Sequence, residues 1–165
     1  MQAVDLQQTI EEALVATQQL VAESDIELNK HMSSESLEVM VDKDKMIQVV
    51  INLISNAVKF CDTDNGVIDV SISQDKGMAF VEVIDNGSGI PVGEEIRIFE
   101  KFHQVSDAQD GKPRGTGLGL PICRRIVEHH GGRIWAENSP DQGAKLVFTL
   151  PIRNVGDQAK AVSNS

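Results

Sequence analysis

The chain has 165 residues, of which 41% are hydrophobic and 24% are charged, and this composition predicts one globular domain with a single core. Its formal net charge of -10 argues against binding to nucleic acid or to an anionic membrane surface, because like charges repel. Two widely separated cysteines, Cys61 and Cys123, argue against a zinc site and a disulfide framework, so both are expected to be free, partly buried thiols.

The first part of the chain predicts a helix, two short strands and a second helix. Apolar residues recur at three-to-four spacing from Leu6 to Val21, which is typical of an amphipathic helix. The short runs 26–30 and 37–41, separated by a Ser-rich turn, predict a β-hairpin. Asp42 then offers an N-cap for a helix that continues to about Phe60.

Two strands with a tight turn between them come next. Residues 68–73 alternate between apolar and polar, residues 75–77 form the turn, and residues 78–84 are a nearly continuous apolar strand. Residues 101–115 are too polar to pack against a core and are interpreted as a mobile loop.

The last part of the chain predicts a third helix and two strands. The helix runs from about Leu118 to His130 and is stopped by two glycines, and strands are expected at 133–137 and 145–150. The segment after Arg153 is expected to be a disordered tail. Because strands come in pairs between helices, the order favours an α+β sandwich, one mixed sheet with helices on one face, over a doubly wound fold.

Three polar residues share one face of the second predicted helix. Asn52 and Asn56 are four positions apart and Lys59 lies three further on, so their side chains project together. An amide oxygen can ligate Mg²⁺, and a lysine ammonium can contact a phosphate. The alternative is an ordinary solvated helix face, which this pattern alone does not exclude.

A polar hexapeptide, Asp85 to Ile90, follows the apolar strand. Its glycines would let the backbone approach a ligand closely, and its carboxylate could accept a hydrogen bond from the exocyclic amine of adenine. Guanine has an oxygen at that position, so such a site would discriminate against it. The alternative is an ordinary Asx-Gly turn after a strand.

A further glycine segment, Gly115 to Leu120, opens the third predicted helix. The exposed N–H groups and the dipole of a helix start suit phosphate. The segment does not follow a strand and has no acidic residue about 20 positions on at the end of a second strand, so it fails the dinucleotide fingerprint. It also lacks the Gly-Lys-Ser/Thr ending of a P-loop.

Taken in order, four segments resemble the N box, first glycine box, F box and second glycine box of the sensor histidine kinases, a branch of the GHKL superfamily. They are residues 52–60, 85–90, 98–102 and 115–120, and the resemblance covers residues 4–152. It implies a two-layer α+β sandwich of Bergerat type, with a mixed five-stranded sheet covered on one face by about three helices and a mobile ATP lid. Residues 1–152 would be the ATP-binding catalytic domain and residues 153–165 a tail.

The resemblance also implies a role for each matching residue. Asn52 and Lys59 would be catalytic residues on the phosphate side of ATP, Asn56 would ligate Mg²⁺, and Asp85 would bind the adenine amine. Phe99 and Phe102 resemble lid anchors, with plain core aromatics as the alternative. The nucleotide-binding positions implied are Asn52, Asn56, Lys59, Phe60, Asp85, Gly87, Gly89, Ile90, Gly115, Thr116, Gly117, Leu118 and Gly119.

Two departures bear on mechanism. Related gyrase-type and chaperone ATPases have a water-activating glutamate at the position of Asn52, and asparagine cannot act as a base. The family's phosphoacceptor histidine lies in a characteristic pattern on a preceding two-helix dimerisation unit, and none of His31, His103, His129 and His130 lies in such a pattern. His129 and His130 are expected at a helix end, where a positive charge is favourable. The resemblance therefore implies γ-phosphate transfer to a histidine on another segment, with no autophosphorylation by this chain alone.

The implied partners are a dimerisation and histidine-phosphotransfer domain and, indirectly, a response regulator receiver domain, without nucleic acid or direct membrane contact. Two alternatives remain: an anti-sigma-type serine kinase of the same superfamily, and a non-catalytic interaction module. No apolar run reaches the roughly 20 residues that span a bilayer. A cytoplasmic location is expected, and whether a longer protein is anchored in the inner membrane stays open.

Overall fold

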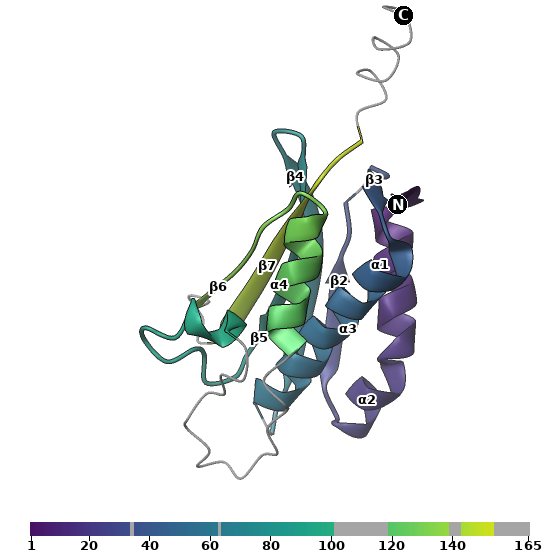
Figure 1. Cartoon of the computed structure of the whole chain (residues 1–165). Helices are drawn as coiled ribbons and strands as arrows, with labels where there is room; N and C mark the ends of the chain where they lie inside the picture. The colour runs from purple at the N-terminus through teal and green to yellow at the C-terminus, as the bar shows by residue number, and fades with distance from the viewer. Residues whose placement is uncertain (34, 63, 101–118, 139–142, 154–165) are drawn as a thin grey trace, which may run out of the picture.

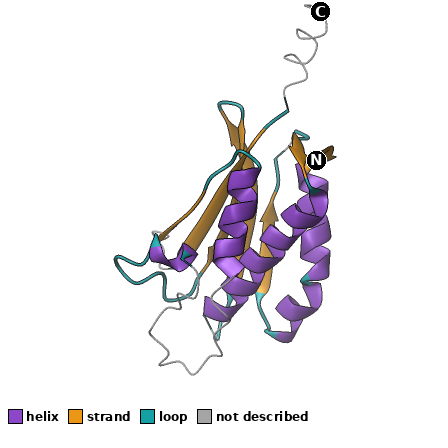
Figure 2. Cartoon of the chain, viewed as in Figure 1, coloured by secondary structure: helices purple, strands orange, loops and turns teal. Residues whose placement is uncertain are grey.

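The computed structural model describes residues 1–33, 35–62, 64–100, 119–138 and 143–153. They form two layers, a five-stranded sheet and a set of helices on one of its faces (Figure 1). Figure 2 shows the same separation, with the helices lying in front of the strands. This architecture confirms the predicted α+β sandwich. The predicted lid loop and the tail after Arg153 lie outside the described residues.

The sheet is mixed, with the strand order β2-β4-β5-β7-β6. β4 (Val67–Asp75) and β5 (Met78–Asp85) form the predicted hairpin, whose turn holds Lys76 and Gly77 at positive φ. β5 pairs antiparallel with β7 (Ala144–Pro151), which pairs antiparallel with β6 (Ile134–Asn138). β2 (Glu27–His31) lies parallel to β4 at the other edge.

The hairpin predicted from residues 26–30 and 37–41 is wrong. β2 joins the large sheet, whereas β3 (Glu38–Val41) pairs antiparallel with β1 (Gln2–Asp5) in a separate two-stranded sheet. Each strand finds its partner far along the chain, and the spacing of apolar residues within a strand does not reveal which strand will pair with it. β1 itself was not predicted.

The end of the described chain returns to β3. Ile152 forms a β-bridge with Val39, and the backbone N–H of Arg153 donates to the Glu38 carbonyl at 2.7 Å. The Arg153 guanidinium also pairs with the Glu38 carboxylate at 2.8 Å. The two ends of the described chain are therefore attached to the same short strand.

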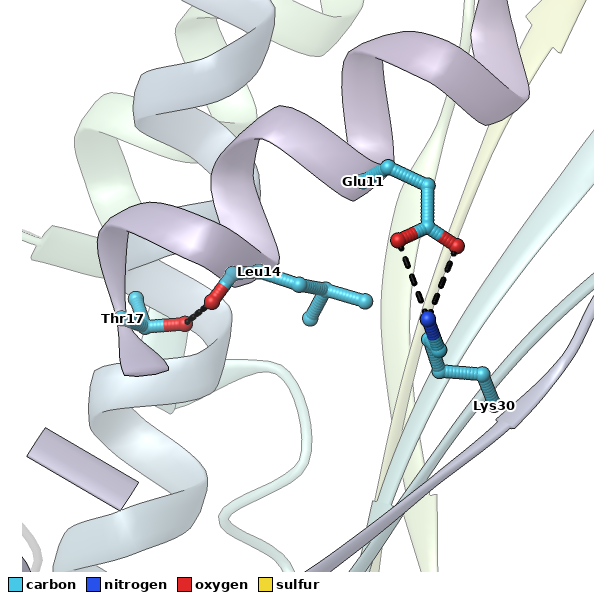
Figure 3. A network of polar contacts seen from close by, with 4 residues as sticks. All are labelled: Glu11, Leu14, Thr17 and Lys30. Atoms are coloured by element: carbon cyan, nitrogen blue, oxygen red, sulfur yellow. Dashed lines mark hydrogen bonds and ion pairs between the residues drawn. The ribbon is translucent and has the colours of Figure 1, made fainter. Parts of the chain in front are cut away.

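The predicted helix of residues 6–21 is divided by Thr17 into α1 (Leu6–Ala16) and α2 (Gln18–Glu23). The Thr17 hydroxyl lies 3.2 Å and 3.1 Å from the carbonyl oxygens of Ala13 and Leu14, to which it donates. A hydroxyl that bonds back to the preceding turn competes with the regular backbone bonds of a helix, and the chain bends out of the helix at this point. Figure 3 shows the bond to Leu14.

Figure 3 also shows the ion pair between Glu11 of α1 and Lys30 of β2, with an N–O distance of 3.1 Å. Both side chains are about half exposed, so this pair contributes little to stability. It does link the first helix to the edge strand that lies beneath it.

The predicted second helix is α3 (Lys43–Phe60), and it begins as expected because the Asp42 carboxylate accepts a hydrogen bond from the N–H of Lys45 at 3.3 Å. The predicted third helix is α4 (Gly119–His129), followed by Gly131 at positive φ. The helices bury their apolar faces against the sheet in one core, which includes Leu6, Ile10, Met46, Val50, Leu53, Ile68, Val70, Val81, Val83, Val127, Leu146 and Phe148.

His130 joins the end of α4 to the start of α3. Its ring is buried, with 7% of the residue exposed. Nδ1 lies 2.7 Å from the carbonyl oxygen of Ile126 and donates to it, so Nε2 is the acceptor for the backbone N–H of Asp42 at 3.0 Å. The structural role predicted for this histidine is confirmed. His129, the other histidine predicted at this helix end, is exposed.

A short 3₁₀ helix, η1 (Arg97–Phe99), lies against α4 and buries Ile98 and Phe99 in the core. Phe99 is thus a core aromatic in this structure, and Phe102 lies outside the described residues. None of the helices in the described ranges combines the length and the apolar character needed to cross a membrane.

Candidate functional site

The second half of α3 carries the three predicted polar residues. Asn52 and Asn56 are half-buried and Lys59 is exposed, while Leu53 and Ala57 between them are buried in the core. Within the described residues, the Asn56 side chain makes no hydrogen bond and the Lys59 ammonium makes no ion pair. The three polar side chains therefore lie outside the buried stripe of this helix.

Asn52 is held by a contact with α4. Its side chain hydrogen-bonds the thiol of Cys123, whose Sγ also donates to the carbonyl oxygen of Val49 at 3.7 Å. Cys123 is fully buried, and this burial raises the pKa of its thiol to about 12. Cys61 is also buried and free, so the prediction of two free thiols is confirmed.

These contacts give the alignment of α4 with α3. His130 lies at Asp42 and Cys123 lies at Asn52, so the two helices run antiparallel. Gly119 precedes Cys123 by four residues, about 6 Å along a helix, which brings the start of α4 towards the Asn56 end of α3. Gly119 is exposed there, and the predicted phosphate-binding residues Gly115, Thr116, Gly117 and Leu118 lie outside the described residues.

Asp85 ends β5 and is buried, with 4% of the residue exposed. Its Oδ1 atom accepts hydrogen bonds from the backbone N–H of Gly87 at 2.8 Å and of Ala144 at 3.4 Å. The carboxylate is therefore held by its own loop on one side and by the start of β7 on the other.

The loop after Asp85 packs directly on the end of α3. A Cβ atom at Gly87 would lie 1.7 Å from the carbonyl oxygen of Phe60, so no side chain fits there without a backbone shift. Gly143, before β7, comes equally close to the Asp85 carbonyl, with a Cβ that would lie 1.9 Å from the oxygen. The end of α3, the end of β5 and the start of β7 thus meet at one place.

Asn86 anchors the same loop to the turn between α3 and β4. Its Oδ1 accepts from the N–H groups of Asp62 and Val67 at 3.3 and 3.0 Å, and its Nδ2 donates to the Asn65 carbonyl at 2.6 Å. Sequence reasoning assigned this residue no separate role. Its place inside the hexapeptide was the only local signal.

Asn138, at the end of β6, was also missed. Its side chain makes two hydrogen bonds to the backbone of Ile90, which is 48 positions earlier in the chain. A polar residue at the end of a strand, ahead of a turn, was the only signal in the sequence, and it did not indicate the partner.

The structure brings five of the predicted residues together at one end of the fold, beside the Asn56 and Lys59 end of α3. They are Phe60, Asp85, Gly87, Gly89 and Ile90. Phe60 and Ile90 are half-buried, and Ile90 packs against the core.

Comparison with known proteins points to one family. Residues 41–154 match the model of the histidine kinase-, DNA gyrase B-, and HSP90-like ATPases. The chain is 34% identical over 136 residues to the sensor histidine kinase WalK of Bacillus subtilis, covering 82% of this chain and 22% of WalK. It is 37% identical over 155 residues to the adaptive-response sensory kinase SasA of Prochlorococcus marinus (strain MIT 9303), covering 92% of this chain and 40% of SasA. The chain thus spans less than half the length of these curated relatives.

The fold gives the same answer. A nucleotide-free structure of the catalytic domain of histidine kinase ThkA superimposes with a TM-score of 0.78 at 32% identity, covering 90% of this chain and 93% of that one. The match takes in nearly all of both chains. On sequence and structure together, the chain belongs to the histidine kinase-, DNA gyrase B- and HSP90-like ATPases, among which it is a catalytic domain of the histidine kinase type.

Proposed function

We propose that the chain binds Mg-ATP and, within a sensor histidine kinase, passes the γ-phosphate to a histidine on a separate dimerisation domain. The observation that carries this proposal is the meeting of the buried Asp85 carboxylate with the end of α3, next to Asn56 and Lys59. The carboxylate that would recognise the base and the polar face that would contact the phosphates lie at the same end of the fold.

On the base side, Asp85 would accept a hydrogen bond from the exocyclic amine of adenine. The backbone N–H groups of Gly87 and Ala144 hold this carboxylate through Oδ1. Guanine would place an oxygen against this carboxylate, which leaves two acceptors facing each other. Phe60 and Ile90 would contact the base, and Gly87 and Gly89 would keep the pocket open to it.

On the phosphate side, the donor set fits a magnesium nucleotide. Amide oxygens are ligands for a hard cation, so Asn56 would hold Mg²⁺, and the Lys59 ammonium and Asn52 would contact phosphate oxygens. The start of α4, at Gly119, would direct N–H groups and a positive dipole end towards the phosphates, together with Gly115, Thr116, Gly117 and Leu118. Bound Mg²⁺ would neutralise phosphate charge during the transfer.

Asn52 supports a kinase in place of a hydrolase. An amide cannot take a proton from water, and the bond to the Cys123 thiol holds this side chain in a neutral surrounding. The γ-phosphate would therefore persist until a histidine from another segment reaches it.

Structures of other histidine kinases support this assignment. Full-length ShkA, with a TM-score of 0.78 at 27% identity, was solved in complex with AMPPNP. ThkA, at 30% identity, was solved in complex with the response regulator protein TrrA. We propose a dimerisation domain as the direct partner and a response regulator as the indirect one. The sensor kinases among the relatives favour this assignment over the anti-sigma-type serine kinase.

Calorimetric titration with a non-hydrolysable ATP analogue and Mg²⁺ tests the proposal. The wild type should bind the ATP analogue and not the GTP analogue. Asp85→Asn should weaken binding by about 100-fold, because a buried amide offers a donor to the adenine amine. Asp75→Asn is the matched control, since the exposed Asp75 lies at the opposite end of β4, at the turn.

Two results would count against the proposal. Absence of ATP-analogue binding by the wild type would favour the alternative hypothesis, a non-catalytic interaction module. Acid-labile phosphate forming on the isolated chain with ATP would show that one of its own histidines is the acceptor.

A further inference from the structure

We propose that Asn138 is a positioning residue for the nucleotide base, which fixes the Gly89–Ile90 loop in the conformation that the adenine pocket needs. The inference rests on the proposed nucleotide site, whose base side includes Ile90. Asn138 does not itself belong to any of the four segments that predicted this site.

The contact between Asn138 and Ile90 satisfies both backbone groups of one residue. Oδ1 accepts from the Ile90 N–H at 2.7 Å, and Nδ2 donates to the Ile90 carbonyl at 3.1 Å. A side-chain amide offers a donor and an acceptor side by side, just as a neighbouring strand does. Asn138 thus supplies, in a loop, the pairing that a sheet would give.

The contact between Asn138 and Ile90 requires a glycine at position 89. It has φ +83°, and a Cβ atom on it would lie 2.8 Å from Oδ1 of Asn138. Any other residue would be strained at this φ and would push the amide away from Ile90. The glycine of the loop and the asparagine of β6 therefore fit each other as a pair.

The same cross-strand position also holds Asp85. Asn138 of β6 lies opposite Ala144 of β7 in the sheet register, and the Ala144 N–H donates to Oδ1 of Asp85. One rung of the sheet thus fixes both the carboxylate and the Ile90 side of the base pocket. A site held by a sheet is positioned more accurately than one that relies on a loop alone.

Loss of the Asn138 side chain should disorder the Gly89–Ile90 loop without lowering the stability of the whole domain. Asn138 is exposed, so its truncation to alanine leaves no cavity in the core. Without it, the loop would have to be ordered by the nucleotide, and the cost of ordering would appear as lower affinity for ligands that carry a base.

The test uses Asn138→Ala, Asn138→Asp and the control Asn29→Ala. Asp keeps the acceptor for the Ile90 N–H but turns the carbonyl contact into two facing oxygens. Asn29 is matched because its side-chain amide bonds Asp69 at the far edge of the same sheet. The readouts are the affinity for Mg-ADP by calorimetry, and amide hydrogen exchange at Ile90 and at the buried Val83, followed by NMR in the nucleotide-free chain.

We expect Asn138→Ala to weaken Mg-ADP about tenfold and to speed exchange at Ile90 at least tenfold, with Val83 unchanged. Asn138→Asp should weaken Mg-ADP by at least threefold, and Asn29→Ala should stay within twofold of the wild type. The inference is overturned if Asn138→Ala binds Mg-ADP within twofold of the wild type. It is also overturned if this substitution speeds exchange at Val83 as much as at Ile90.

Failure of the proposed function would look different. If the wild type did not bind Mg-ADP, both the proposed nucleotide site and the role of Asn138 in nucleotide binding would be refuted. Exchange at Ile90 would still report whether the amide holds the loop.

Discussion

The link between α3 and α4 through His130 can be tested by removing the ring. His130→Ala deletes the acceptor for the backbone N–H of Asp42, which is the N-cap residue of α3. The Ile126 carbonyl keeps a partner, because the backbone N–H of His130 also lies 3.2 Å from it. The substitution therefore leaves one half-buried donor without a partner and a gap where the ring was.

The expected loss of stability follows from these two terms. An unpaired buried donor costs about 1–3 kcal/mol. The gap adds a cavity cost below that of a deleted aliphatic core residue, about 1 kcal/mol for a ring that is partly polar. Together they predict that His130→Ala lowers the free energy of unfolding by about 2–4 kcal/mol, a large share of the total for a domain of this size.

Urea denaturation followed by the fluorescence of Trp135, the one tryptophan of the chain, measures the change. His129→Ala is the matched control, since it removes the same ring from the neighbouring exposed position. Surface substitutions of this kind stay within about 0.5 kcal/mol of the wild type. If the two variants unfold within about 0.5 kcal/mol of each other, His130 does not hold the helices together.

Two further predictions concern ionisable groups. Burial raises the pKa of the Cys123 thiol from 9.0 to about 12, so above pH 9 only the unfolded chain gives up this proton. Stability should then fall by up to about 1.4 kcal/mol per pH unit between pH 9 and pH 12, and Cys123→Ala should lack this part of the slope in urea titrations. An equal slope in both proteins would contradict it. Lys145→Met removes ion pairs to Glu82 and Glu137, at 3.1 and 3.2 Å, and should cost about 1 kcal/mol at low salt. The cost should shrink in 1 M NaCl, and a salt-independent loss would mean that packing of the side chain is responsible.

Patterns within one element predicted the fold well where the element's own residues decide it. The cap at Asp42 and the buried stripe behind it defined α3, and the positive φ values at Lys76 and Gly77 belong to the turn that was expected there. The partner strands of β2 and β3 could not be predicted, because β2 pairs with β4 and β3 pairs with β1, both far away in the sequence. Thr17 divides a helix whose apolar spacing is unbroken, since the cause is a hydroxyl bond and not hydrophobicity.

The candidate site shows the same division. The resemblance of four segments brought Phe60, Asp85 and Gly87 into one prediction, and the structure has them adjacent. Asn86 and Asn138 act on backbone groups that lie 19–24 and 48 positions away, so no local pattern could assign them. Contacts between segments that lie far apart in the sequence are recognised only in the folded chain.

The attachment of both ends of the described chain to β3 has a mechanical consequence. A pull between Gln2 and Arg153 is carried across the β1–β3 ladder and the Ile152 bridge. Ile152 lies at the turn end of β5, and Asp85 ends that strand seven residues after Met78, about 23 Å away. Tension applied between these two residues is therefore resisted at the end of the sheet opposite the loop of residues 85–90, so it does not load the proposed nucleotide site.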